Sequence, residues 1–177
     1  GIYAVNGILF NHESPRRGAN FVSQKIIRGI KQIIDRKIDY LLLGNLDAER
    51  DWGHAKDYVL AMWQMLQLKT PDDFVISTGE STSVREFCLK AFNAVGIELE
   101  FSGNGTEEVG KVISLATNYE GLKIDDSLIR VDKRFFRPLE VNFLKGSSAK
   151  ANKIFNWKPH NNLDDLIKDM LNNEEIY

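Results

Sequence analysis

Two short apolar runs with a helical segment between them constrain the fold of this chain more than any other feature. Tyr3–Phe10 and Tyr40–Leu43 have the length and composition of strands. Between them, Asn20 has a side chain suited to a helix cap, and apolar residues recur after it at helical spacing. We therefore predict a helix from Asn20 to about Lys37. A strand, a helix and a second strand in succession indicate an α/β fold that begins with mostly parallel pairing.

The same alternation continues along the chain, in a second half that looks more mixed. We interpret Asn11–Ala19 as a loop, Gly44–Gly53 as a turn, and the acidic stretch Gly103–Ser127 as irregular. Further strands are predicted at Phe74–Ser77, Ile97–Phe101 and Leu128–Val131. Further helices are predicted at Lys56–Leu68, from Thr82 or Ser83 to about Val95, at Ser147–Phe155 and at Leu163–Leu171. In the first of these helices, one face is expected to carry Val59, Met62, Trp63 and Leu66.

Composition excludes several classes of protein. The 177 residues carry a net charge of -2, which is not the strong positive charge typical of nucleic-acid binding. The single cysteine, Cys88, cannot form an internal disulfide and favours a reducing, cytoplasmic compartment. No apolar run is long enough to predict a membrane span. Because a strand-like run begins almost at Gly1 and no methionine precedes it, we expect a fragment of a longer chain.

The loop in Phe10–Val22, FNHESPRRGANFV, has an unusual density of polar groups directly after a strand. Ligands of open α/β sheets collect at the carboxyl ends of strands. Asn11, His12, Arg16 and Arg17 offer hydrogen-bond donors there, and a planar arginine matches two phosphate oxygens at once. The loop is therefore a candidate phosphate-binding site. A solvated surface loop with incidental charge is the alternative, and the residues alone do not favour either.

The stretch Gly44–Val59 contains two pairs of residues that could bind a ligand or stabilise the fold. Arg50 and Asp51 could bind an anion or form an ion pair packed on the neighbouring tryptophan. His54 and Asp57 lie three residues apart near a helix start. Two ligands are too few for a zinc site, and an aspartate is also favourable at the positive end of a helix. We therefore predict no metal site.

Arg137 and Glu140 form a third polar pair, in the sequence FRPLE. An arginine and a carboxylate together could bind the phosphate and the ribose hydroxyls of a nucleotide. A surface ion pair, worth about 0–1 kcal/mol, is the plainer interpretation.

Two other features are interpreted as structural. Gly103–Gly110 is glycine-rich, but its spacing differs from a dinucleotide fingerprint and its two glutamates would repel phosphate. We predict a flexible loop there. Cys88 lies at helical spacing with apolar neighbours and is predicted to be a core thiol.

Five stretches of the chain together resemble a known family: GILFNHESPRRGANFV, LGNLDAERDWGHAKDYV, DFVISTGESTSVREF, FFRPLEVNFLKG and NWKP. They are similar, in order, to the second half of GDP-mannose 4,6-dehydratases, which are extended short-chain dehydrogenases/reductases. The resemblance covers nearly the whole chain and is weakest at Gly103–Lys123. It implies that residues 1–177 form the last strands of a Rossmann-type sheet together with a smaller mixed α/β substrate-binding domain.

The resemblance also implies a reaction, in which GDP-mannose becomes GDP-4-keto-6-deoxymannose plus water with NADP as cofactor, towards GDP-fucose. In the family, the glycine fingerprint, the acid/base Thr and Glu and the catalytic Tyr-x-x-x-Lys pair all lie upstream of the first of these stretches. The catalytic residues are therefore expected upstream of Gly1, in an N-terminal dinucleotide-binding half. The chain by itself is expected to be inactive.

The resemblance assigns binding roles residue by residue. His12 and Arg17 are expected to contact NADP, and the Arg16–Gly18 loop to approach a neighbouring subunit of a homodimer or homotetramer. The expected GDP-mannose contacts are Asn11 at the diphosphate, Lys25, Arg50 and Arg137 at the phosphates, Glu140 at the ribose, and Gly44 and Asn45 near the nucleoside.

Two other functions stay open from the residues alone. The chain could belong to another nucleotide-sugar epimerase or dehydratase of the same superfamily, or it could be a noncatalytic nucleotide-binding module.

Overall fold

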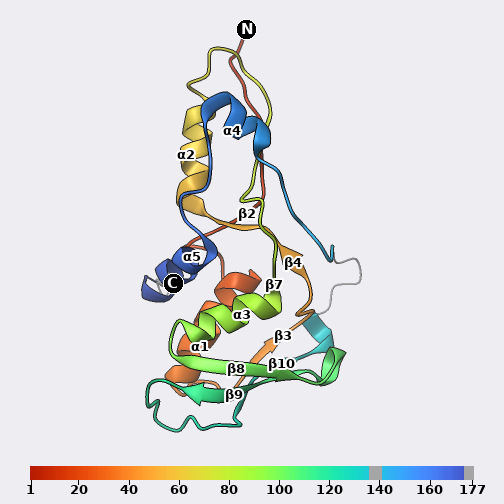
Figure 1. Cartoon of the computed structure of the whole chain (residues 1–177), viewed down its shortest axis with the longest axis vertical. Helices are drawn as coiled ribbons and strands as arrows, with labels where there is room; N and C mark the ends of the chain where they lie inside the picture. The colour runs from red at the N-terminus through yellow and green to blue at the C-terminus, as the bar shows by residue number, and fades with distance from the viewer. Residues whose placement is uncertain (136–140, 174–177) are drawn as a thin grey trace.

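The computed structural model describes residues 1–135 and 141–173, which form two lobes joined by several crossing segments (Figure 1). The strands are β1 (Gly7–Leu9), β2 (Asn11–Glu13), β3 (Leu41–Leu43), β4 (Glu49–Arg50), β5 (Trp52–His54), β6 (Phe74–Ile76), β7 (Thr82–Ser83), β8 (Ile97–Ser102), β9 (Val109–Leu115) and β10 (Ser127–Val131). The helices are α1 (Val22–Ile34), α2 (Ala55–Met65), α3 (Val84–Asn93), α4 (Ala149–Phe155) and α5 (Leu163–Asn172), with 3-10 turns η1 (Gly105–Glu107) and η2 (Lys133–Phe135).

Strand pairing confirms the α/β class predicted from the alternating pattern. β1 pairs with β6, β2 with β5 and β3 with β10, all in parallel. The second half is mixed, because β9 lies antiparallel between β10 and β8, and β4 pairs antiparallel with β7. We call β1, β6, α2 and α4 the small lobe, and α1, α3, α5, β3 and β8–β10 the large lobe.

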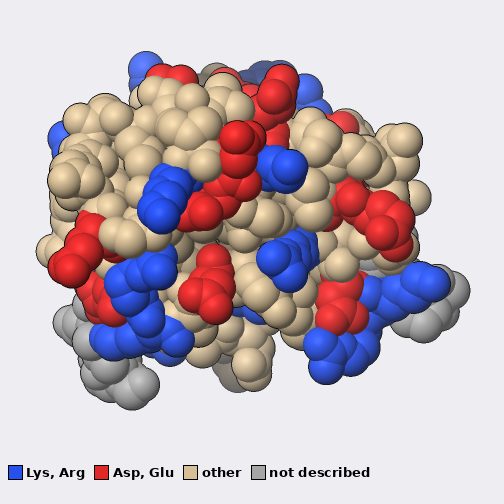
Figure 2. Space-filling view, turned by 90° about the horizontal axis from the view of Figure 1, so that it is seen from below, with Lys and Arg blue, Asp and Glu red and all other residues tan. Residues whose placement is uncertain are grey.

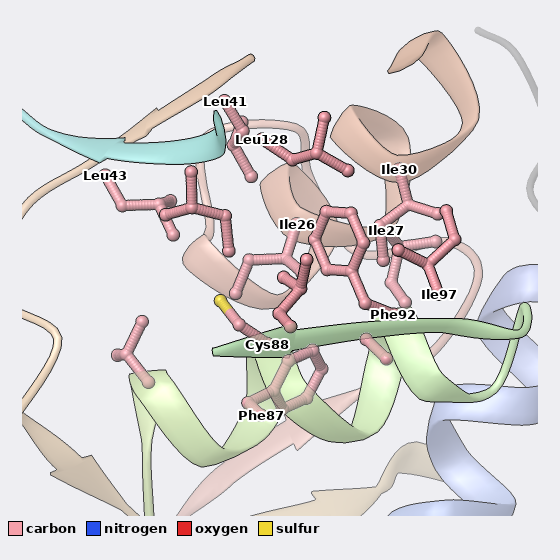
Figure 3. Close-up of a cluster of buried hydrophobic side chains, with 14 of the residues drawn as sticks. Ile26, Ile27, Ile30, Leu41, Leu43, Phe87, Cys88, Phe92, Ile97 and Leu128 are labelled. Carbon is pink, nitrogen blue, oxygen red and sulfur yellow. The ribbon is translucent and has the colours of Figure 1, made fainter. Parts of the chain in front are cut away.

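The large lobe is held by an apolar core beneath helices α1 and α3. The buried isoleucines of α1 recur at helical spacing, so one stripe of the helix faces the core. Figure 3 shows this stripe meeting side chains from β3, α3, β8 and β10. The labelled residues are Ile26, Ile27, Ile30, Leu41, Leu43, Phe87, Cys88, Phe92, Ile97 and Leu128. Cys88 is fully buried, and burial raises the pKa of its thiol, which confirms its prediction as a core thiol.

The start of α1 differs from the prediction. The helix begins at Val22, and its N-cap is Phe21, which makes no side-chain capping bond. Asn20 is not the cap, because the chain forms a turn there in which the Phe21 N–H donates to the Gly18 carbonyl. The helix ends at Ile34, close to Arg36, whose φ of 60° is left-handed.

The small lobe has its own core around the β1–β6 pair. Tyr58, Ala61 and Met65 of α2 are buried there, packed with residues of β6 and the segment around Trp157. The predicted apolar face of α2 is a different one. Val59, Met62, Trp63 and Leu66 are 37–61% exposed, because the helix turns its other apolar stripe towards the strands.

Three short strands and one longer strand lie wholly or mostly in segments that were predicted to be loop, turn or irregular. β2 lies inside Asn11–Ala19, β4 lies inside Gly44–Gly53, and β5 begins inside that turn and ends one residue after it, at His54. Each of these strands has only two or three residues, which is too short for a periodic pattern. β9 lies inside Gly103–Ser127. The glycines and acidic residues of that stretch are atypical of a strand, so the sequence did not predict it. The predicted flexible loop Gly103–Gly110 contains η1, and its Glu108 is buried and paired with Arg85.

A buried carboxylate joins the segments that cross between the lobes. Asp51 is fully buried and accepts hydrogen bonds from the Thr78 N–H (2.8 Å) and hydroxyl (2.6 Å), and from the backbone N–H groups of Gly79 (2.9 Å) and Gly146 (3.2 Å). These donors come from two separate stretches of chain. The sequence left two interpretations of Arg50 and Asp51, an anion site and an ion pair. Asp51 takes part in neither; it stabilises the fold by accepting hydrogen bonds from Thr78, Gly79 and Gly146.

Charges on the surface are mixed rather than segregated. Figure 2 shows lysines and arginines interspersed with aspartates and glutamates on the lower face of the molecule. Within the described residues, every helix is too short or too polar to serve as a membrane span.

We predict that Asp51→Ala lowers the free energy of unfolding by about 3 kcal/mol, because four partly buried donors lose their buried acceptor together. Asp47→Ala is the matched control, since the Asp47 side chain is 79% exposed and pairs with Arg85 at the surface. It is expected to cost about 0–1 kcal/mol. Urea unfolding followed by circular dichroism measures both changes. Equal losses in the two variants would contradict the role given to Asp51.

Candidate functional site

A cavity of about 540 Å³ opens where β2, the start of α1 and the end of β3 meet. This volume lies within the range of small-molecule sites. All of the predicted GDP-mannose contacts in the described part of the chain line it: Asn11, Lys25, Gly44, Asn45 and Arg50. Asn11 follows the end of β1, and Gly44 and Asn45 follow the end of β3. Ligand-binding residues commonly follow strand ends in α/β proteins, so these positions agree with the expectation from the sequence.

Lys25 supplies a half-buried cation to the cavity. Its Nζ lies 3.4 Å from the centre of the Phe135 ring, a cation–π contact. Burial lowers the pKa of Lys25, and the Asp132 carboxylate partly opposes this shift. Phe135 also crosses closely over Gly44, where a Cβ atom would collide with the Phe135 carbonyl. A larger residue at position 44 would therefore displace Phe135 and the Lys25 contact with it.

Arg50 lies across the cavity and contacts backbone as well. Its Nη1 donates to the carbonyls of Glu49 (2.7 Å) and Val141 (2.6 Å). Asn45 accepts a hydrogen bond from the Asp47 N–H through its side-chain oxygen, at 3.0 Å. Its side-chain nitrogen is not used in that contact.

His12 and Arg17, the predicted cofactor contacts, do not line the cavity. Successive side chains of a strand point to opposite faces, and Asn11 and Glu13 of β2 line the cavity while His12 does not. The His12 ring stacks on Tyr58 with centroids 5.0 Å apart, and its Nδ1 lies 2.8 Å from the Phe10 carbonyl oxygen. β2 therefore places His12 on the opposite face from Asn11 and Glu13, whereas Arg17 contacts Glu13 and the Phe21 ring.

Arg137 and Glu140 lie outside the described residues. Of the described residues that flank 136–140, Phe135 lines the cavity and Val141 contacts a residue that lines it. Phe135 packs on Lys25 and Gly44, and Val141 accepts a hydrogen bond from Arg50.

His54 and Asp57 stabilise the fold. His54 Nδ1 accepts a hydrogen bond from the Lys56 N–H and caps α2, so the proton lies on Nε2, which is 2.9 Å from Asp169 Oδ2. Asp57 accepts from the backbone N–H groups of His160 and Asn161. No group of three or more His, Cys, Asp or Glu side chains in the described part of the chain is arranged to hold a metal ion.

Several residues of the cavity were not predicted from the sequence. Glu13 is the most prominent, a carboxylate only 1% exposed. Recognising β2 as a strand would have identified it, because Glu13 lies two residues after Asn11 and faces the same side. Aromatic residues give the cavity its apolar walls, and no spacing in the sequence connects them: Phe21, Trp52 and Phe135.

Comparison with known proteins identifies the family. The family model described as GDP-mannose 4,6 dehydratase matches residues 1–170. The chain belongs to the GDP-mannose 4,6-dehydratase family. A GDP-mannose 4,6 dehydratase of Cricetulus griseus is 51% identical over 170 residues, which are 96% of this chain and 43% of that protein. Those of Drosophila melanogaster and Homo sapiens are 48% and 49% identical over the same share of this chain.

The chain thus spans less than half the length of these curated relatives of the GDP-mannose 4,6-dehydratase family. Solved structures support the fold. RMD from Pseudomonas aeruginosa, complexed with NADPH, superposes with a TM-score of 0.69 at 17% identity, over 94% of this chain and 46% of that chain. A putative epimerase from Burkholderia cenocepacia gives a TM-score of 0.66 at 20% identity, over 95% and 45% of the respective chains.

We predict a pH-dependent effect of Glu13→Gln on stability. Burial raises the pKa of Glu13 above 4.5, although the Ser23 hydrogen bond and Arg17 oppose this shift. A carboxyl group with a raised folded-state pKa stabilises the fold most below its unfolded pKa, and this contribution is lost as pH rises through the folded-state pKa. The free energy of unfolding of the parent chain should therefore fall, relative to Glu13→Gln, as pH rises from about 4.

Urea unfolding at a series of pH values from about 4 to 7 measures this difference. The exposed Glu120→Gln controls for the loss of one surface charge. A difference between the parent and Glu13→Gln that grows in favour of the parent with rising pH would contradict the prediction.

Proposed function

We propose that this chain forms the GDP-sugar site of a GDP-mannose 4,6-dehydratase, which converts GDP-mannose to GDP-4-keto-6-deoxymannose and water. One observation carries the proposal: in a chain of this family, Asn11, Lys25, Gly44, Asn45 and Arg50 converge on a single cavity. These residues come from separate parts of the sequence. The shared cavity is therefore a property of the fold rather than of one motif.

The cavity offers chemically suitable groups for a nucleoside diphosphate. We assign the diphosphate to Lys25, Arg50 and the Asn11 amide, because cations and N–H donors bind phosphate oxygens strongly. Gly44 and Asn45 are assigned to the nucleoside. Arg137 and Glu140 complete the proposed set, at a phosphate and at the ribose.

For the cofactor, we propose a nicotinamide dinucleotide, specifically NADP, contacted by His12 and Arg17. The guanidinium and the imidazole offer nitrogen groups suited to phosphate oxygens; His12 lies on the other face of β2 from the sugar cavity, and Arg17 lies against Glu13 at its edge. His12 and Arg17 would hold the dinucleotide, which when bound would supply hydride transfer to and from the sugar. Residues of this chain would orient the sugar against it, because correct placement accelerates hydride transfer.

We propose that residues 1–177 are the C-terminal portion of the enzyme, with the last Rossmann strands interleaved with the substrate-binding domain. Proton transfer would come from residues N-terminal to this portion, so the chain alone is not expected to turn over. The complete enzyme is proposed to be a cytoplasmic homodimer or homotetramer, with the Arg16–Gly18 loop near a neighbouring subunit.

Lys25→Met in the full-length enzyme should weaken GDP-mannose binding by about ten- to a hundredfold, because a charge-assisted contact contributes about 1.5–3 kcal/mol. Lys25 is a cleaner test than Arg50, whose guanidinium also stabilises the backbone at Val141. Lys153→Met is the matched control, since Lys153 is exposed on α4 and outside the cavity. Calorimetry with GDP and steady-state kinetics with GDP-mannose measure the effect.

The same calorimetry with UDP and dTDP tests the alternative that the chain serves another nucleotide-sugar enzyme. GDP should bind most tightly. Preference for UDP or dTDP would overturn the assignment of GDP-mannose, and equal affinities of Lys25→Met and the parent would overturn the phosphate role of Lys25.

A further inference from the structure

Glu13 is a buried carboxylate at the boundary between the two proposed sites. It ends β2, lines the sugar cavity and is 1% exposed. The Ser23 hydroxyl donates to its Oε2 at 2.7 Å, and Arg17 Nε lies 2.9 Å from the same oxygen. Glu13 thus faces the cavity while it contacts a residue proposed to bind the cofactor.

Arg17 is brought back over Glu13 by a tight turn. The Arg17 N–H donates to the Ser14 carbonyl at 2.9 Å, which places the two side chains together. The guanidinium carbon lies 3.4 Å from the centre of the Phe21 ring. One face of the guanidinium therefore stacks on that ring, while its Nε edge lies against the Glu13 carboxylate. The closest contact of the pair is at Nε, whose N–H is not aligned for a hydrogen bond with the carboxylate, so the pairing is electrostatic.

We infer that Glu13 is a positioning residue, which fixes the Arg17 guanidinium so that its terminal amino groups face a phosphate of the dinucleotide. The inference rests on the proposed function, in which Arg17 contacts the cofactor. Arginine has many side-chain rotamers, and restricting them before the ligand arrives strengthens binding. Glu13 and the Phe21 ring together provide that restriction.

The charge of Glu13 supports a role beyond packing. A buried carboxylate is unfavourable unless a cation or several donors compensate for it. The Ser23 hydroxyl alone could be satisfied by a neutral amide, which also offers an acceptor oxygen. The negative charge is favoured by Arg17, which contacts the carboxylate directly, and by the nearby His12. Glu13 also lines a cavity proposed to take a diphosphate, where an uncompensated negative charge would repel the ligand.

A double-mutant cycle in the full-length enzyme tests the inference. The variants are Glu13→Gln, Arg17→Met and the double variant, with NADPH affinity measured by its fluorescence and GDP affinity by calorimetry. Glu13→Gln should weaken NADPH about tenfold and change GDP affinity less than about twofold. In the Arg17→Met background, Glu13→Gln should change NADPH affinity less than about twofold, because its effect passes through Arg17.

Ser23→Ala is the control, since it removes the other partner of Glu13 and keeps the pair with Arg17. NADPH affinity should stay within about twofold of the parent in this variant. A purely structural role of Glu13 would instead lower NADPH affinity in Ser23→Ala as well, and would overturn the inference.

Three further results would overturn it. Additive effects of Glu13→Gln and Arg17→Met would show that Glu13 does not act through Arg17. Equal weakening of GDP and NADPH by Glu13→Gln would place its action in the sugar cavity. In both cases the GDP-sugar assignment, tested by Lys25→Met, is unaffected. Unchanged NADPH affinity in Arg17→Met would overturn the cofactor role of Arg17 and the inference together.

Discussion

The carboxylate of Asp51 is the interaction on which the arrangement of the two lobes depends. It accepts hydrogen bonds from Thr78, Gly79 and Gly146, which belong to chain segments that pass between the lobes. A buried carboxylate needs several donors to offset its desolvation, and buried backbone N–H groups need an acceptor. Each requirement is met only when the segments lie together. The adjoining residues of β4 and β5 are thereby fixed, including Arg50 and Trp52 of the cavity wall.

The strand β2 then divides the functional surface. Because side chains alternate along a strand, Asn11 and Glu13 line the cavity while His12 packs against Tyr58 away from it. Three consecutive residues can thus contribute to two sites. The strand ends at Glu13, which lines the cavity and also contacts Arg17.

Much of the fold could be predicted from sequence, and the errors have identifiable causes. The helix α1 and the strand β3 have long or strongly apolar patterns, and both occur where expected. β2, β4 and β5 are too short to show a period, and they exist because strands distant in sequence pair with them. For α2, both the Tyr58 stripe and the Trp63 stripe are apolar, so periodicity alone could not identify which one is buried.

The candidate site likewise has some features that the sequence predicts and others that only the structure shows. The sequence by itself determined the family, because long stretches of it resemble that family in order, and it proposed Lys25, Arg50 and Gly44 as site residues. It also determined that Cys88 belongs to the core, because its apolar neighbours recur at helical spacing. Only the tertiary structure decided that the cavity residues converge, that Asp51 and His54 stabilise the backbone, and that Glu13 meets Arg17. Convergence depends on parallel pairing and on buried hydrogen bonds between segments far apart in the chain, and a linear pattern contains neither.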